Sequence, residues 1–297
     1  MIGISKLYFG TVEASDRLRY RKGVHRRPVV VWNCTPACNL ACSHCYAACA
    51  GEQRVLTTDQ ARAVIDDLAA FGVPVILFSG GEPFLRPDIR TLAAHAKARG
   101  IRVTFSTNGT LIDDAWADWI RDLGVAYVGI SIDGTEAIHD AFRRHPGAYR
   151  QSLAAIRRLR DRGVKVGLRV TMTRDNVASL PAIFDLMRRE RVPRICLYHL
   201  VYTGRGREIA ATDLDHAEAR AALNTILAET RTCFETGFPV EVLTVDNACD
   251  GIALYLRMKA ENHPNADQAL ELLTLNGGNS SGEGIGCISW DGTVYPD

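Results

Sequence analysis

Five of the nine cysteines lie within residues 34–49, and three of these have the spacing Cys38-x3-Cys42-x2-Cys45. Three thiolates on one short loop can hold three irons of a cubane cluster, whereas electron-transfer clusters are normally held by four cysteines. The remaining open metal position can accept a substrate or cofactor, as it does in catalytic zinc sites. A structural zinc site and loosely grouped free thiols are alternatives, but zinc sites usually pair two C-x2-C units. The spacing therefore favours a catalytic iron–sulfur site.

Three further motifs with polar or glycine residues follow later apolar runs: GGEP, STNG and SIDG. Glycines let a backbone approach a ligand closely, and the carboxylate of Glu82 can accept hydrogen bonds from an ammonium group. Arg143, in the segment HDAFR, has a planar fork that suits a carboxylate. For Ser106 and Asn108 the alternative is that they only cap turns. The candidate ligand-binding residues of these segments are Gly80, Gly81, Glu82, Pro83, Ser106, Asn108, Ser131, Asp133 and Arg143.

Elements that must position these residues follow from the hydrophobic pattern, in which short β-branched runs alternate with longer helical segments. This alternation is typical of repeated βα units and a parallel sheet. The predicted strands are Pro28–Trp32, Pro74–Phe78, Ile101–Phe105, Ala126–Ile132, Lys165–Met172 and Arg194–Leu200. The predicted helices are Thr58–Phe71, Asp88–Arg99, Asp113–Leu123, Ala148–Arg162, Leu180–Glu190 and Asp213–Thr236. The sequence predicts an α/β protein with a partial (β/α)6, TIM-like barrel, and all four motifs lie at its C-terminal mouth.

Composition limits the size of the protein and its partners. The 297 residues, 47% of them hydrophobic, can bury a large core, and the net charge of +1 gives no general attraction to nucleic acid or membrane. No apolar run reaches the ~18 residues of a membrane span, and the N-terminus lacks the layout of a secretion signal, so we expect a cytoplasmic protein. We expect an N-terminal extension (1–27), the barrel (28–236) and a small C-terminal extension (237–297), where the pattern weakens.

The sequence resembles the radical SAM superfamily, whose hallmark is C-x3-C-x2-C with an aromatic residue before the last cysteine. This chain has His44 at that position and Tyr46 on the other side of the cysteine. The resemblance implies that the three cysteines hold a [4Fe–4S] cluster that cleaves S-adenosylmethionine (SAM) to start a radical reaction. Cys34 and Cys49 are then bystanders, because the superfamily pattern does not use them.

The same resemblance assigns SAM-binding roles to the motifs after predicted strands two to four. The GGEP motif, with Glu82, engages the amino group of SAM's methionine. Ser131 and Arg143 bind its carboxylate, and Asp133 contacts the ribose. The STNG motif contributes Ser106 and Asn108 to the surroundings of SAM.

A polar and aromatic segment, LYHLVYTGRGRE, follows the sixth predicted strand. Its candidate substrate-binding residues are Tyr198, His199, Tyr202, Arg205 and Arg207. Such a set could stack on and pair with a large, flat ligand that bears carboxylates, with His199 reaching a haem iron. A solvated loop, with a neutral structural His199, is the alternative.

This segment, the opening MIGISKLYFGTVE and the tail GIGCISWDGTVYPD resemble the radical SAM enzymes of haem d1 and alternative haem biosynthesis. The resemblance implies an iron-tetrapyrrole substrate, 12,18-didecarboxysirohaem, whose acetate groups are removed to give iron-coproporphyrin III, with flavodoxin or ferredoxin as electron donor. Alternatives are a propionate-modifying haem d1 synthesis enzyme, a coprohaem decarboxylase, a SPASM-type peptide-modifying enzyme, and a non-enzymatic haem or cluster carrier. A carrier has no need of a SAM pocket, so the motifs argue against it.

Cys287 is a candidate ligand of a second iron–sulfur cluster. Relatives with a SPASM or twitch extension have an auxiliary-cluster cysteine after a pattern like DGTVYP, where this chain has Asp297. We therefore expect residues 237–297 to be a truncated form of such an extension. The alternative for Cys287 is a buried thiol in a hairpin.

Overall fold

The computed structural model describes residues 1–10, 27–47, 53–278 and 281–296. Its strands are β1 (Ile2–Gly3), β2 (Val29–Asn33), β3 (Val75–Ser79), β4 (Arg102–Thr107), β5 (Tyr127–Ser131), β6 (Val166–Thr171), β7 (Arg194–Tyr198), β8 (Glu241–Val245), β9 (Ile285–Ile288) and β10 (Val294–Tyr295). Its α-helices are α1 (Ile4–Phe9), α2 (Thr58–Phe71), α3 (Ile89–Ala98), α4 (Asp114–Leu123), α5 (Glu136–Arg143), α6 (Ala148–Asp161), α7 (Leu180–Glu190), α8 (His216–Glu235), α9 (Cys249–Ala260) and α10 (Ala266–Asn276). Short 3-10 helices are η2 (Pro83–Leu85), η3 (Val177–Ser179) and η4 (Gly204–Thr212). None of these helices combines the length and apolar composition that crossing a bilayer requires.

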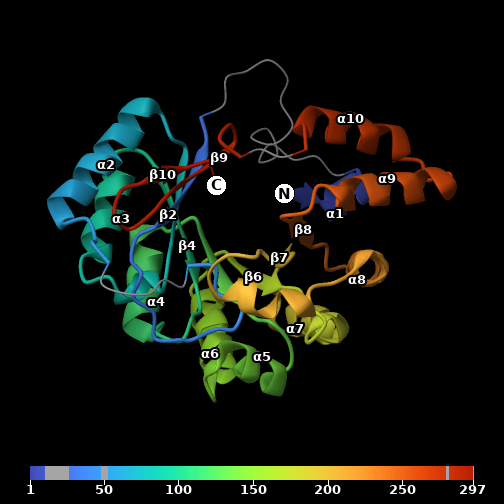
Figure 1. Ribbon diagram of the computed structural model, residues 1–297, viewed down its shortest axis with the longest axis horizontal. Coiled ribbons are helices and arrows are strands. Elements are labelled where there is room, and N and C mark those ends of the chain that lie inside the picture. The colour runs from blue at the N-terminus through green and yellow to red at the C-terminus, as the bar shows by residue number, and fades with distance from the viewer. Residues whose placement is uncertain (11–26, 48–52, 279–280, 297) are drawn as a thin grey trace.

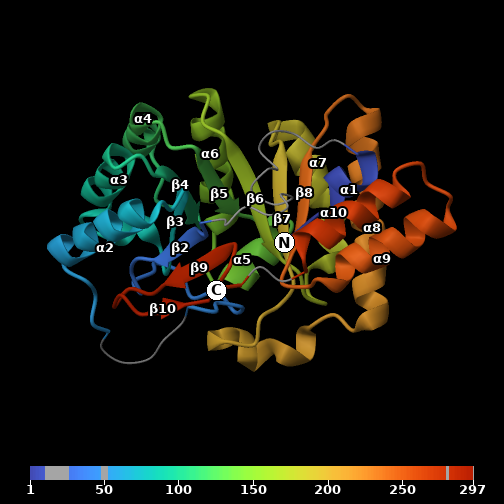
Figure 2. The same ribbon diagram turned by 90° about the horizontal axis from the view of Figure 1, so that it is seen from above.

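All strands of the described residues form one curved sheet in the order β1-β8-β7-β6-β5-β4-β3-β2-β9-β10. Neighbours from β9 and β2 through to β8 are parallel, and the short strands β1 and β10 pair antiparallel at the two edges. Figure 1 shows the helices as an outer arc around the strands, and Figure 2 shows the same arrangement from above. The fold is the predicted α/β, partial TIM-like barrel, so the carboxyl ends of the parallel strands meet at one mouth.

All six predicted strands are present as β2 to β7, with bounds that differ by no more than a few residues. The parallel sheet nevertheless continues beyond the six predicted units. β8 pairs with β7, and β9 pairs with β2, where Cys287 lies in register with Val31. The three strands of the described part of residues 237–297, β8, β9 and β10, therefore belong to the same sheet as the barrel, while the division of the chain into domains at residue 237 stays a prediction.

The core lies between the sheet and the helices. Side chains of successive strands stack there, with ring centroids 5.8 Å apart for Trp32 and Phe78 and 5.6 Å apart for Phe78 and Phe105. Buried aromatic side chains contribute strongly to such packing because each removes a large apolar area from water. Helix α2 begins where predicted, with a capping box between Thr57 and Gln60. The core and the caps fix the strand ends, which carry the candidate site.

Helix α1 packs against β8 and α8 near the β1 edge of the sheet. The Phe9 ring stacks on Phe234 of α8 with a centroid separation of 3.8 Å, and the Ser5 hydroxyl accepts a hydrogen bond from the backbone N–H of Val242 in β8 at 3.0 Å. The first ten residues of the expected N-terminal extension are thus packed against the barrel, and residues 11–26 lie outside the described part of the chain.

Candidate active site

The loop after β2 carries the three candidate cluster cysteines at the mouth of the barrel. The Cys38 side chain is exposed, Cys45 is half-buried and Cys42 is buried. Among the described residues, no three His, Cys, Asp or Glu side chains are grouped so as to hold a single metal ion. A cubane cluster binds each cysteine through a different iron, so its three thiolates need not converge on one point. Cys49 lies outside the described residues.

The turn after β3 holds the cysteine loop through its backbone. The N–H of Gly81 donates to the carbonyl of Thr35, and the N–H of Glu82 donates to the carbonyl of Ala37, both at 2.7 Å. A Cβ atom on Gly81 would lie only 2.2 Å from the Ala37 carbonyl oxygen. The glycine is therefore needed for close approach to the cysteine loop, a role that sequence reasoning had connected only with a ligand.

We expect Gly81→Ala to loosen the cysteine loop, because the added methyl group would meet backbone atoms that cannot rotate away. The expected loss of stability is about 1–3 kcal/mol, with fewer than ~4 irons bound per chain after reconstitution. Thermal unfolding and iron analysis measure the two effects. Gly286→Ala is the matched control, since the nearest atom to its new methyl group is 4.0 Å away. Equal behaviour of the two variants would contradict this role.

Glu82 is fully buried and links the ends of β3 and β4. Its Oε1 accepts hydrogen bonds from the Thr107 hydroxyl at 2.7 Å and the Phe84 N–H at 3.3 Å, and its Oε2 accepts from the Asn108 N–H at 2.9 Å. Burial raises the pKa of Glu82 to about 7, although these hydrogen bonds oppose the rise. The carboxylate thus joins the GGEP and STNG motifs, and its predicted contact with SAM stays a prediction.

Asn108 extends the same connection to the cysteine loop. Its side-chain nitrogen donates to the Asn39 side-chain oxygen at 3.0 Å, and its own side-chain oxygen accepts from the backbone N–H of Thr110 at 2.8 Å. The second contact caps a turn, which is the alternative role that the sequence allows for Asn108. Ser106 and Ser131 lie half-buried near the carboxyl ends of β4 and β5.

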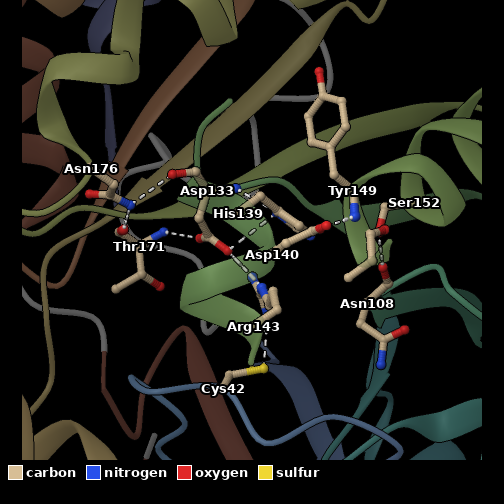
Figure 3. Close-up of polar contacts among 11 residues, drawn as sticks. Cys42, Asn108, Asp133, His139, Asp140, Arg143, Tyr149, Ser152, Thr171 and Asn176 are labelled. Carbon is tan, nitrogen blue, oxygen red and sulfur yellow. Dashed lines mark hydrogen bonds and ion pairs between the residues drawn. The ribbon is translucent and has the colours of Figure 1, made fainter. Parts of the chain in front are cut away.

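A buried ion pair joins the SIDG motif to a cluster cysteine (Figure 3). Two nitrogens of Arg143, at the end of α5, lie 2.6 and 2.5 Å from Oδ2 of Asp133, and a third donates to the Cys42 sulfur at 3.5 Å. Burial alone would lower the pKa of Arg143, but the nearby Asp133 and Cys42 hold it above its usual range. Arg143 therefore places positive charge beside Cys42. Sequence reasoning named both charged residues but missed their pairing.

His139 is a further residue of this site that sequence reasoning missed. Its Nδ1 accepts a hydrogen bond from the Asp133 backbone N–H at 3.1 Å, while its buried Nε2 has no hydrogen-bond partner among the described residues (Figure 3). Burial lowers the pKa of His139 to about 4, so the ring is neutral near neutral pH. Because the His139 ring is uncharged, it does not compensate the negative charge of the Asp133 carboxylate. Arg143 provides that compensation. The only sequence signal was a histidine four residues before that arginine.

Of the predicted substrate-binding residues, the structure brings Arg205 to the cysteine loop. Its Nε donates to the Cys42 carbonyl at 2.7 Å, and its backbone N–H donates to the Cys45 carbonyl at 3.0 Å. A Cβ atom on Gly204 would lie 2.4 Å from the same Cys45 oxygen. The start of η4 therefore supports the cluster loop, a contact that the sequence did not indicate.

The other four predicted substrate residues do not form a single cluster. Nε2 of His199 lies 2.9 Å from Oδ2 of Asp250 in α9, which fits the structural alternative for this ring. Tyr202 is exposed and donates its hydroxyl proton to Asp213, and Arg207 is also exposed. Tyr198, at the end of β7, follows the core residue Leu197, so its side chain lies on the opposite, inner face of the sheet. Substrate contact by these residues stays a prediction.

Cys287 lies on β9, directly beside the strand that leads into the cysteine loop. The Asn33 side-chain nitrogen is 3.6 Å from its sulfur, and the Asn33 oxygen accepts a hydrogen bond from the Tyr46 hydroxyl at 3.1 Å. The cysteine is buried. These contacts connect Cys287 to the site, and its role in a second cluster stays a prediction.

Comparisons with known proteins agree with this arrangement. The sequence profile of the Radical SAM superfamily matches residues 32–187. The Fe-coproporphyrin III synthase of Methanosarcina barkeri is 50% identical over 100% of this chain and 78% of its own length. The pre-heme d1 synthase of Dinoroseobacter shibae is 43% identical over 91% of this chain and 68% of its own length. Streptococcus suis SuiB bound to S-adenosylmethionine superposes with a TM-score of 0.72 at 14% identity, over 91% of this chain but only 60% of that structure.

Proposed function

This chain belongs to the radical SAM superfamily, and from that premise we propose that Cys38, Cys42 and Cys45 are the ligands of its [4Fe–4S] cluster. Enzymes of this superfamily use such a cluster together with SAM. When bound, the cluster and SAM supply one-electron cleavage to methionine and a 5′-deoxyadenosyl radical, while the protein supplies binding and orientation. The spacing of the three cysteines at the mouth of the barrel supports their assignment.

The chain's own residues then hold SAM beside the cysteine loop. The proposed SAM-binding set comprises Gly80, Gly81, Glu82, Pro83, Ser106, Asn108, Ser131, Asp133 and Arg143. Arg143 keeps positive charge next to Cys42 because Asp133 orients its guanidinium group. A fixed charge of this kind stabilises nearby thiolates without any rearrangement during the reaction. Contacts from the GGEP turn and from Arg205 keep the loop in place.

The reaction that we propose is removal of the acetate groups of 12,18-didecarboxysirohaem to give iron-coproporphyrin III. One observation carries this choice: the 50% identity to Fe-coproporphyrin III synthase extends over the whole chain and 78% of that relative. The 43% identity to pre-heme d1 synthase makes propionate modification of the same precursor the second candidate. A flavodoxin or ferredoxin is the proposed source of electrons. The likeness to SuiB concerns the fold alone.

We expect anaerobic, reduced enzyme to convert didecarboxysirohaem to iron-coproporphyrin III, with one 5′-deoxyadenosine formed for each acetate removed. Mass spectrometry of the tetrapyrrole and chromatography of the nucleoside measure the two products. Enzyme without reductant is the control. A product that keeps its acetates but has altered propionates would support the second candidate. Absence of both tetrapyrrole binding and SAM cleavage would contradict the proposal.

A further inference from the structure

Arg169 occupies an unusual position inside the barrel. Its neighbours on β6, Leu168 and Val170, are buried in the core beneath the helices. Because successive side chains of a strand point to opposite faces, Arg169 faces the interior. It lies in register with Ser131, the last residue of β5. The guanidinium therefore belongs to the carboxyl half of the barrel, near the proposed SAM site.

Two neighbouring strands hold this side chain in place. On β5, a Cβ atom added to Gly129 would lie 2.8 Å from Cδ of Arg169, so the glycine leaves room for the aliphatic stem. On β7, the ring of Tyr198 lies beneath the guanidinium, whose Cζ is 4.6 Å from the ring centroid. A guanidinium stacked on an aromatic ring keeps its in-plane N–H groups available to another partner.

The Arg169 backbone carbonyl accepts a hydrogen bond from the Ile132 N–H, but no described residue supplies its guanidinium group with an ion pair or hydrogen bond. Several other buried or half-buried arginines have carboxylate partners, as in the pairs Arg143–Asp133 and Arg188–Glu229, and Arg205 donates to the Cys42 carbonyl. Even Arg194, which faces the interior from the start of β7, has a nitrogen 3.3 Å from Glu241. A partly desolvated cation costs free energy unless an anion compensates for it. The interior of the barrel thus has a positive charge for which the described chain offers no acid.

The cysteine loop lies at the same end of the barrel as Arg169. It follows Asn33, the last residue of β2, just as Arg169 is in register with Ser131, the last residue of β5. The Tyr46 hydroxyl, one residue after Cys45, donates to the Asn33 side chain and so ties the loop to this end of the sheet. An anion bound at Arg169 would therefore lie at the end of the barrel that carries the cluster cysteines.

We propose that Arg169 binds a carboxylate of the substrate inside the barrel, and so orients an acid-bearing side chain of the tetrapyrrole toward the cysteine loop. This assignment rests on the proposed function. The planar fork of arginine can donate two parallel hydrogen bonds to one carboxylate, which fixes orientation as well as position. Tyr198 has a defined part in the same site, since its ring supports the guanidinium.

The test compares iron-coproporphyrin III with its tetramethyl ester, titrated anaerobically into the reconstituted holoenzyme in one detergent buffer. We expect Arg169→Gln to bind the free acid about 10-fold to 100-fold more weakly, and to bind the ester with unchanged affinity. Arg169→Lys should restore part of the loss, since it keeps the charge without the fork. Arg150→Gln, at a side chain that is 78% exposed, is the matched control. SAM binding by calorimetry should be equal in all four proteins.

Each other result overturns a specific statement. If the wild-type protein and Arg169→Gln bind the free acid equally well, the role of Arg169 is overturned. The proposed function is then unaffected. A variant that loses SAM affinity but keeps porphyrin affinity would place Arg169 in the SAM site instead. Wild-type protein that binds neither porphyrin overturns the proposed substrate and the role of Arg169 together.

Discussion

Replacing Cys38, Cys42 and Cys45 together by Ala should remove the ~4 irons per chain that one [4Fe–4S] cluster contributes, and should abolish 5′-deoxyadenosine formation. The fold should survive, because the loop is held by backbone groups rather than by its thiols: Gly81 and Glu82 donate to it, and Arg205 donates to the Cys42 carbonyl. Iron analysis and visible absorption measure the loss, and circular dichroism checks the fold.

Cys34→Ala is the matched control for the triple replacement. Cys34 lies four residues before Cys38, but it is buried, and its S–H donates to the Ser79 carbonyl at 3.4 Å. Its sulfur is thus occupied by a contact with the end of β3, and Cys34 lies outside the spacing of the three proposed ligands. The control should keep its iron. A triple variant that binds as much iron as the control would contradict the assignment of the cluster.

Removing Asp133 should destabilise the protein strongly, because Asp133→Ala leaves Arg143 buried without its carboxylate. Loss of one partner of a buried ion pair costs about 3–5 kcal/mol. The backbone N–H of Thr171 would also lose its acceptor, Oδ1 of Asp133, at 3.1 Å. Chemical denaturation measures the change. Asp122→Ala, which breaks an ion pair at a side chain that is 66% exposed, should change stability by less than about 0.5 kcal/mol.

A double variant separates the charge effect from simple loss of packing. In Asp133→Ala/Arg143→Met, no buried charge is left unpaired, so we expect it to be more stable than Asp133→Ala alone. Losses that simply add across the two sites would contradict a coupled pair. Asp133→Asn, which keeps the shape but not the charge, should fall between wild type and Asp133→Ala.

The positions of the site loops could be predicted because each depends on local sequence. The run Val75–Ser79 is apolar and lies between Pro74 and Gly80, which limit a strand on both sides. Helix α2 has the predicted bounds, because its cap and its periodicity agree. Parallel strands of a barrel place the loops that follow them at the same mouth. The position of each motif directly after a predicted strand was therefore sufficient to predict that the motifs lie together.

The contacts between the loops could not be predicted from local patterns. Arg143 meets Cys42 across 101 residues of chain, and Arg205 meets it across 163. Such pairs depend on how α5 and η4 fold back over the mouth. The same limit applies to β8, whose five residues Glu241–Val245 have the composition of a strand but pair with Ile2–Gly3 at the far end of the sequence.

At each edge of the sheet, a segment from the first part of the chain pairs with a segment from the last part. This affects the order of folding. Asn33 and Cys287 touch across 254 residues, and Ser5 and Val242 touch across 237. Contacts of such long range form slowly, because the intervening loop must first close at an entropic cost. During synthesis, the βα units from β2 to β7 can assemble while β2 still has an unpaired edge. The strand that leads to the cluster cysteines therefore gains its second neighbour only after the ribosome has made β9, and until then its backbone can pair with other chains.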